Sequence, residues 1–155
     1  MTRYVIAAIL LLVAVFGLPS LRPAKVNPAP PLSVDMREAV RPLLPVVAKM
    51  TAIDRFWMQE AYLNAARIVR ADLTVAEPAI TTTGKARAVH VTVLDFVWRG
   101  LAGNQPGKYP DMSTAIESAF VSVVGDKERP MTPELTEKLA ALFEAIAWAG
   151  LGKDG

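Results

Sequence analysis

The stretch that decides the fold is Thr51–Val75, TAIDRFWMQEAYLNAARIVRADLTV, near the middle of the chain. Its apolar residues recur every three to four positions, which is the period of an amphipathic helix. Thr51 and Asp54 resemble a capping box with a shortened acid, so we predict that a helix of about residues 52–75 begins here. One arc of this helix is apolar and is expected to face a core: Trp57, Met58, Ala61, Tyr62, Ala65, Ile68 and Val69.

Before this stretch, the same period predicts a shorter helix that begins after Ser33. Pro42 and Pro45 interrupt it, because proline lacks the backbone N–H that a helix interior uses and its ring clashes with the preceding turn. We therefore expect a kink or a restart near Arg41. The apolar side chains expected to face inward are Met36, Val40, Leu43, Val47 and Met50.

Three more helices are predicted after the central stretch, at about residues 84–101, 111–124 and 133–149. Thr132 is the expected N-cap of the last helix, and Gly125 is the expected stop of the helix before it. Loops rich in proline and glycine separate these helices. The predicted fold class is therefore all-α, an N-terminal hydrophobic helix plus a compact bundle of about five helices.

The chain is 52% hydrophobic, and part of this excess lies in the uncharged run Tyr4–Leu18, which ends at Pro19. A spanning helix needs about 20 apolar residues and the core of a secretory signal about 7 to 15, so the run lies at the border between the two. Cleavage after Ser20 would place Leu18 where a small residue is required. We therefore favour an uncleaved anchor over a cleaved signal peptide, with a plain core helix as a third reading.

These patterns divide the chain into four parts. Residues 1–21 form a membrane anchor or signal segment, 22–33 a proline-rich linker, 34–150 the helical domain and 151–155 a C-terminal tail. Positive charge is nearly balanced on the two sides of the apolar run, so its orientation is not fixed by the positive-inside rule. We expect a single-pass or exported membrane protein and slightly favour a periplasmic or extracellular domain.

Charge and composition exclude several classes of function. The formal charge is +2, from 17 basic and 15 acidic residues, and the basic residues form no cluster of the kind that nucleic-acid binding requires. The chain contains no cysteine, which excludes thiol catalysis, disulfide bonds and cysteine metal sites. We expect no cofactor and no nucleic-acid partner, but a membrane contact through residues 4–18 and a protein partner.

Four polar residues form the weaker of two candidate sites. His90, the only histidine, lies in the apolar stripe of the predicted helix 84–101, where a packed core role is the more common one. Glu60, Asn64 and Arg67 follow one another by single turns on the outward arc of the helix 52–75. They can line a polar pocket, although an exposed ion network of small energetic value is the favoured interpretation.

The second candidate is an interaction surface made of five residues. Phe56 and Leu63 are apolar residues among the polar ones of the helix 52–75, and Trp148 lies off the core stripe of the last helix. Lys108 and Tyr109 belong to a proline-framed loop, where a tyrosine supplies contact area at a small entropic cost. A more ordinary role for Tyr109 is to cover the ends of adjacent helices.

Three hypotheses for function follow. The preferred one is a membrane-tethered, non-enzymatic interaction or structural module, for which an accessory part of an envelope or bacteriophage assembly is one setting. The second is an exported small helical enzyme or ligand-binding domain with a site around Glu60, Arg67 or His90. In the third, the N-terminal apolar helix itself acts on membranes and the domain regulates it.

Overall fold

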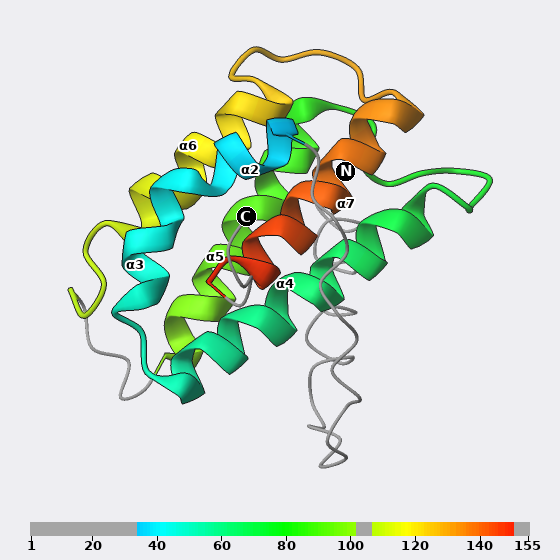
Figure 1. Cartoon of the computed structure of the whole chain (residues 1–155). Coiled ribbons are helices and arrows are strands. Elements are labelled where there is room, and N and C mark those ends of the chain that lie inside the picture. The colour runs from blue at the N-terminus through cyan, green and yellow to red at the C-terminus, as the bar shows by residue number, and fades with distance from the viewer. Residues whose placement is uncertain (1–33, 102–106, 151–155) are drawn as a thin grey trace. The chain divides into compact units, whose positions relative to one another are not determined.

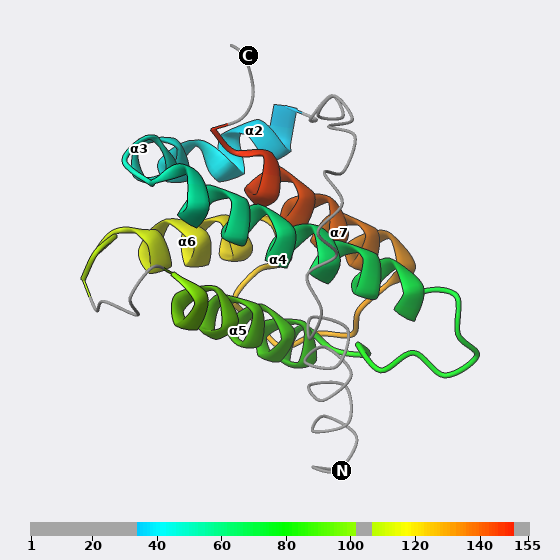
Figure 2. The same ribbon diagram turned by 90° about the horizontal axis from the view of Figure 1, so that it is seen from below.

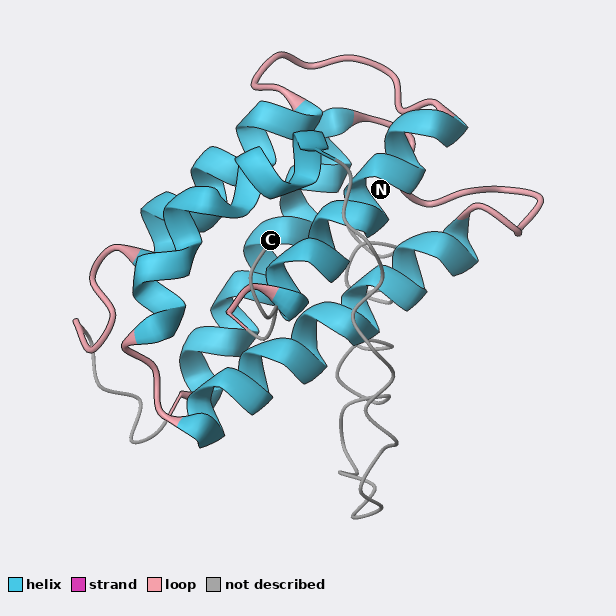
Figure 3. Cartoon of the chain, in the orientation of Figure 1, coloured by secondary structure: helices cyan, strands magenta, loops and turns pink. Residues whose placement is uncertain are grey.

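A computed structural model describes residues 34–101 and 107–150 of the chain. The predicted anchor, linker and C-terminal tail lie outside the described residues. Within them, every regular element is a helix, as Figure 3 shows, and the expected all-α bundle is confirmed for this part of the chain. The elements in chain order are α2 (Val34–Val40), the 3-10 helix η1 (Arg41–Leu43), α3 (Leu44–Ala48), α4 (Ala52–Asp72), α5 (Thr83–Gly100), α6 (Met112–Val124) and α7 (Pro133–Trp148).

The first helical segment is broken where the prolines predict a break. α2 ends at Val40, η1 contains Pro42, and α3 restarts at Leu44 with Pro45 in its first turn. Proline is tolerated in a first turn because the N–H groups there have no partner within the helix. All five side chains predicted to face inward from this segment are buried.

Three of the long helices begin at a threonine. The side-chain oxygens of Thr51, Thr82 and Thr132 each accept a hydrogen bond from the backbone N–H three residues later, at 3.1–3.3 Å. Such a cap contributes about 1 kcal/mol of stability. The N-caps predicted at Thr51 and Thr132 are confirmed, as is the stop at Gly125, which has a φ of +92°. Thr82 lacks a clear signal in the sequence because it lies within a run of three threonines.

The core is built around α7, which packs against α4, α6 and α2. Figure 1 shows α7 between α4 and α2, and Figure 2 places α5 and α2 on opposite sides of the bundle. The large apolar residues of α7 that recur every three to four positions are buried: Leu135, Leu139, Leu142, Phe143 and Ile146. The helical period of the sequence therefore identified the core side of this helix correctly.

α4 and α7 run antiparallel. Tyr62 in the middle of α4 meets Phe143 of α7 edge to face, with ring centroids 5.6 Å apart. Near the C-terminal end of α4, Arg70 donates to two glutamates of α7, to Glu137 at 2.9 Å and to Glu144 at 3.0 Å. These contacts fix the direction and the register of the pair.

The inward arc of α4 is slightly narrower than predicted. Met58, Ala61, Tyr62, Ala65 and Val69 are buried, whereas Trp57 and Ile68 are half-buried. The reason for Trp57 is that its ring stacks against Phe96 of α5, with centroids 5.0 Å apart, at the edge of the core. A Cβ atom added to Gly100 would lie 1.8–2.2 Å from atoms of the same ring, so only glycine fits beside it.

The remaining differences are at helix ends. α4 ends at Asp72, three residues before the predicted end. Assignments of helix ends commonly differ by one or two residues because the last turn frays. Among the described residues, no helix has both the length and the apolar character needed to cross a membrane.

Candidate functional site

The side of α4 that faces away from the core carries exposed apolar residues. Ile53 is 75% exposed and Phe56 is 62% exposed, and the two lie one helical turn apart in the first half of the helix. Residues three, four and seven positions apart share one side of a helix. We use the name α4 outer face for the residues that share this side: Ile53, Phe56, Glu60, Leu63, Asn64, Arg67 and Ala71.

Among the described residues, the two charged side chains of the α4 outer face have no oppositely charged partner. Arg67 donates from Nη1 to Oδ1 of Asn64 at 3.1 Å and meets no carboxylate in the described part of the chain. Glu60 forms neither a hydrogen bond nor an ion pair there. The sequence placed Glu60, Asn64 and Arg67 on one solvated arc, and the structure places them in a row along the outer side of α4.

Leu63 belongs to this face, and Trp148 lies near it. Leu63 is half-buried and packs against the core at the border of the α4 outer face. Trp148 is half-buried and lies one turn after Glu144, so it shares the side of α7 whose glutamates contact Arg70 of α4. Because α4 and α7 are antiparallel, the end of α7 lies beside the first half of α4 (Figure 1). Three of the five residues of the predicted interaction surface therefore lie on adjoining helices.

Tyr109 does not belong to that surface. It is only 4% exposed, and its hydroxyl donates to Oδ2 of Asp54 at 2.6 Å and accepts from the backbone N–H of Thr51 at 3.3 Å. The prediction of an exposed recognition residue is corrected in favour of the other role, that of covering a helix end. The cause is the buried carboxylate of Asp54, which needs hydrogen-bond donors.

Lys108 also binds the carboxylate of Asp54. Its Nζ donates to Oδ2 of Asp54 at 2.8 Å, and this hydrogen bond raises the pKa of Lys108. The loop that carries Lys108 and Tyr109 is thereby fastened to the first turn of α4. Asp54 was predicted only as a capping acid, and its burial was missed because both partners lie more than 50 positions away in the sequence.

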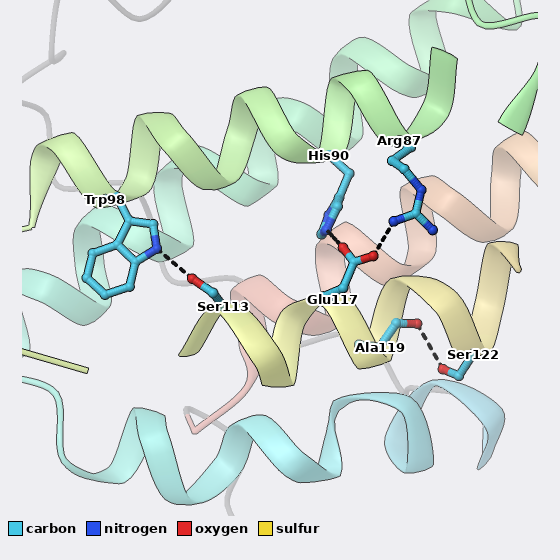
Figure 4. Close-up of polar contacts among 7 residues, drawn as sticks. All are labelled: Arg87, His90, Trp98, Ser113, Glu117, Ala119 and Ser122. Carbon is cyan, nitrogen blue, oxygen red and sulfur yellow. Dashed lines mark hydrogen bonds and ion pairs between the residues drawn. The ribbon is translucent and has the colours of Figure 1, made fainter. Parts of the chain in front are cut away.

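His90 lies in a separate cluster between α5 and α6, drawn in Figure 4. It is fully buried, its Nε2 lies 2.9 Å from Oε2 of Glu117, and its ring stacks on Phe120 with centroids 4.5 Å apart. Arg87 pairs with the other oxygen of Glu117 and lies over the Phe120 ring. The structure therefore joins His90 to Arg87 and Glu117 in the packed core role that its sequence position favours, and among the described residues no hydrogen bond or ion pair links it to Glu60, Asn64 or Arg67.

The protonation states in this cluster follow from its burial. Desolvation lowers the pKa of His90, although Glu117 opposes this by hydrogen bonding and charge. For Glu117, burial raises the pKa, but the hydrogen bonds from Arg87 and His90 outweigh it and the net shift is downward. At neutral pH a charged carboxylate accepts from a neutral imidazole, so Nε2 carries the proton.

The same assignment limits what His90 can do. Its other nitrogen, Nδ1, is buried and has no hydrogen-bond partner among the described residues. A general base must reach the proton that it removes, and this nitrogen is closed off by the helices around it. Trp98, whose Nε1 donates to Ser113 Oγ at 2.8 Å, forms a second polar link between α5 and α6 (Figure 4). The cluster is thus arranged to join two helices.

The described surface also has one open depression, between the end of α6 and the start of α7. It is lined by Val123, Arg129, Pro130, Thr132, Glu134, Leu135 and Lys138. Lys138 and Glu134 pair with each other at 3.4 Å, both on the exposed side of α7. Among residues 34–101 and 107–150, no group of three or more histidine, aspartate or glutamate side chains is placed to hold a metal ion.

Comparison of the chain with models of protein families, with curated proteins and with solved structures finds no match.

We predict that His90 gives the domain a pH dependence. The pKa of His90 is lower in the folded state than its ordinary value near 6.5, so unfolding takes up protons below that value and stability falls as the pH falls. Urea unfolding at pH 7.5 and pH 6.0 is expected to show lower stability at the lower pH. A His90→Gln variant, which keeps a donor for Glu117, is expected to lose this difference.

The control for that experiment is Glu117→Gln. It removes the charge that opposes the lowered pKa of His90, so the fall in stability between the two pH values persists. An unchanged pH dependence in His90→Gln would contradict the assignment to His90.

Two tyrosines in the core are predicted to respond oppositely to the loss of their hydroxyl groups. Tyr109→Phe removes a donor to the buried Asp54 and is expected to lower the free energy of unfolding by about 1–3 kcal/mol. Tyr62→Phe removes a buried hydroxyl that has no hydrogen-bond partner among the described residues, and stability is expected to be unchanged or higher. Chemical denaturation of both variants tests this, and equal destabilisation would refute the distinction.

Proposed function

We propose that residues 34–150 form a non-catalytic interaction module that binds a protein partner through the α4 outer face. The observation that carries this proposal is the exposure of Ile53 and Phe56 on the first turns of the longest described helix. A single exposed apolar side chain is common, but two large ones together beside a polar row resemble the centre and rim of an interface. Burying each on a partner is worth about 1.5–3 kcal/mol.

The two internal polar clusters support the non-catalytic part of the proposal. Asp54 and His90, the buried carboxyl and imidazole groups of the described residues, are both fully inaccessible and both hydrogen-bonded to other side chains. Such groups hold elements together and do not present an atom to a substrate. His90, one of the three residues of the exported-enzyme hypothesis, is therefore used in the fold, whereas Glu60 and Arg67 belong to the α4 outer face.

We further propose that the chain is held at a membrane by residues 4–18, ahead of the proline-rich linker 22–33. The support is the uncharged run Tyr4–Leu18 itself, together with a linker whose prolines favour an extended spacer. An accessory part of an envelope or bacteriophage assembly fits such an arrangement, because it presents a binding domain at a fixed distance from the bilayer.

The interaction is tested by photo-crosslinking in cells that make the protein. A photoreactive phenylalanine analogue at position 56 is expected to form a covalent adduct with another protein chain, and Ile53→Asp in the same chain is expected to reduce it at least tenfold. The matched control is the same analogue at Val91, which is 53% exposed on α5 and is expected to give no adduct. Equal labelling from both positions would remove the case for the α4 outer face.

The tether is tested by extraction of membranes with alkaline carbonate. The full chain is expected to stay with the membranes, and the double variant Leu11→Arg/Val13→Arg is expected to be released, because each arginine costs about 2.5–3.5 kcal/mol in the middle of a spanning helix. Leu44→Arg, at an exposed apolar position of α3, serves as the control and is expected to remain bound. Release of the unaltered chain would refute the tether.

A further inference from the structure

We propose that the partner of the α4 outer face is a second copy of this chain, with the two α4 helices packed antiparallel about a two-fold axis. This inference rests on the proposed function and specifies its partner. A two-fold interface is self-complementary, so that residue i of one copy contacts residue j of the other and j contacts i. The α4 outer face has this property in its charges and in the sizes of its side chains.

Two charged residues of the α4 outer face can pair across such an axis. Glu60 and Arg67 are seven residues apart, about 10 Å along the helix, and neither has an opposite charge to pair with in the described part of the chain. If the axis passes between positions 63 and 64, Glu60 of each copy lies opposite Arg67 of the other. Two ion pairs then form across the interface. A parallel arrangement places Glu60 beside Glu60 and Arg67 beside Arg67, and repulsion excludes it.

The sizes of the side chains fit the same register. It places the ring of Phe56 against Ala71, which is exposed and small, so the partner helix leaves room for an aromatic side chain. It brings Ile53 opposite position 74 of the partner, two residues past the end of the partner α4 and next to Val75, which is 50% exposed. At the axis, Leu63 of one copy lies beside Leu63 of the other. The large apolar residues at one end of the face thus meet small or apolar residues at the other end.

Charge reversal tests this arrangement in the full chain in detergent, with the molecular mass measured by sedimentation. The unaltered chain is expected to be a dimer, and Glu60→Arg or Arg67→Glu alone is expected to weaken dimerisation at least tenfold, because each places like charges opposite each other. An equimolar mixture of the two single variants is expected to recover the dimer, since the arginine introduced in one variant then faces the glutamate introduced in the other. Arg99→Glu, which alters an exposed charge on α5, is the control and leaves the dimer intact.

A cysteine crosslink tests the position of the axis. The chain has no cysteine of its own, so Asn64→Cys introduces a single thiol next to its counterpart in the second copy. Mild oxidation is expected to give a disulfide-linked dimer from Asn64→Cys and none from Val91→Cys.

The outcomes separate this inference from the proposed function. A chain that stays monomeric, or a dimer that neither charge reversal affects, overturns the pairing of α4 with itself. If the adduct formed at position 56 then contains a different protein, the interaction module stands and only the identity of its partner changes. If no adduct forms at all, both proposals fail.

Discussion

The packing of α4 against α7 is the contact on which the rest of the domain depends. Tyr62 and Phe143 meet in the middle of this packing, and one turn from each of them lies a small, fully buried residue, Ala66 in α4 and Ala140 in α7. Such residues let two helices approach closely, because the distance between helix axes is set by the side chains at the contact. α7 in turn packs against α2 and α6, so the position of this one helix determines where three others lie.

This packing also determines which surface remains for a partner. α4 packs against both α7 and α5, and between them they cover its apolar arc. What remains is the α4 outer face, with two large apolar side chains at one end. In its middle are two charged side chains that have no oppositely charged partner among the described residues. The α4 outer face is straight and rigid because α4 is packed against α7 and α5 on its other sides. A rigid surface loses little entropy on binding.

The helices were predictable because each repeats its apolar residues with one period and ends at a residue with a specific conformational role. Thr51, Thr132, Pro42 and Gly125 all mark the boundaries that the structure contains. Cap and proline effects act over a few residues, so the sequence alone reveals them. Predictions failed at the outer edges of helices, where Trp57 packs on a neighbour that helical periodicity cannot identify.

The polar clusters were less predictable for the converse reason. His90 was correctly placed in an apolar stripe, but its partner Glu117 lies on another helix, and spacing along one helix carries no information about the next. Tyr109 was a candidate for a surface role because prolines frame its loop, although covering the ends of adjacent helices was the favoured interpretation. Its hydroxyl turns inward to a carboxylate that was itself expected to be a simple cap. The row on α4 was recognised because all its members belong to a single helix.

The close fit between Gly100 and the indole of Trp57 also constrains how this sequence can change over time. Any side chain at position 100 would overlap the ring, and a smaller residue at position 57 would leave the end of α5 unsupported. A substitution at either position alone would therefore disturb the packing between α4 and α5. Homologous chains are therefore expected to keep the two residues as a pair or to replace both together, which would make these positions a coevolving contact between α4 and α5.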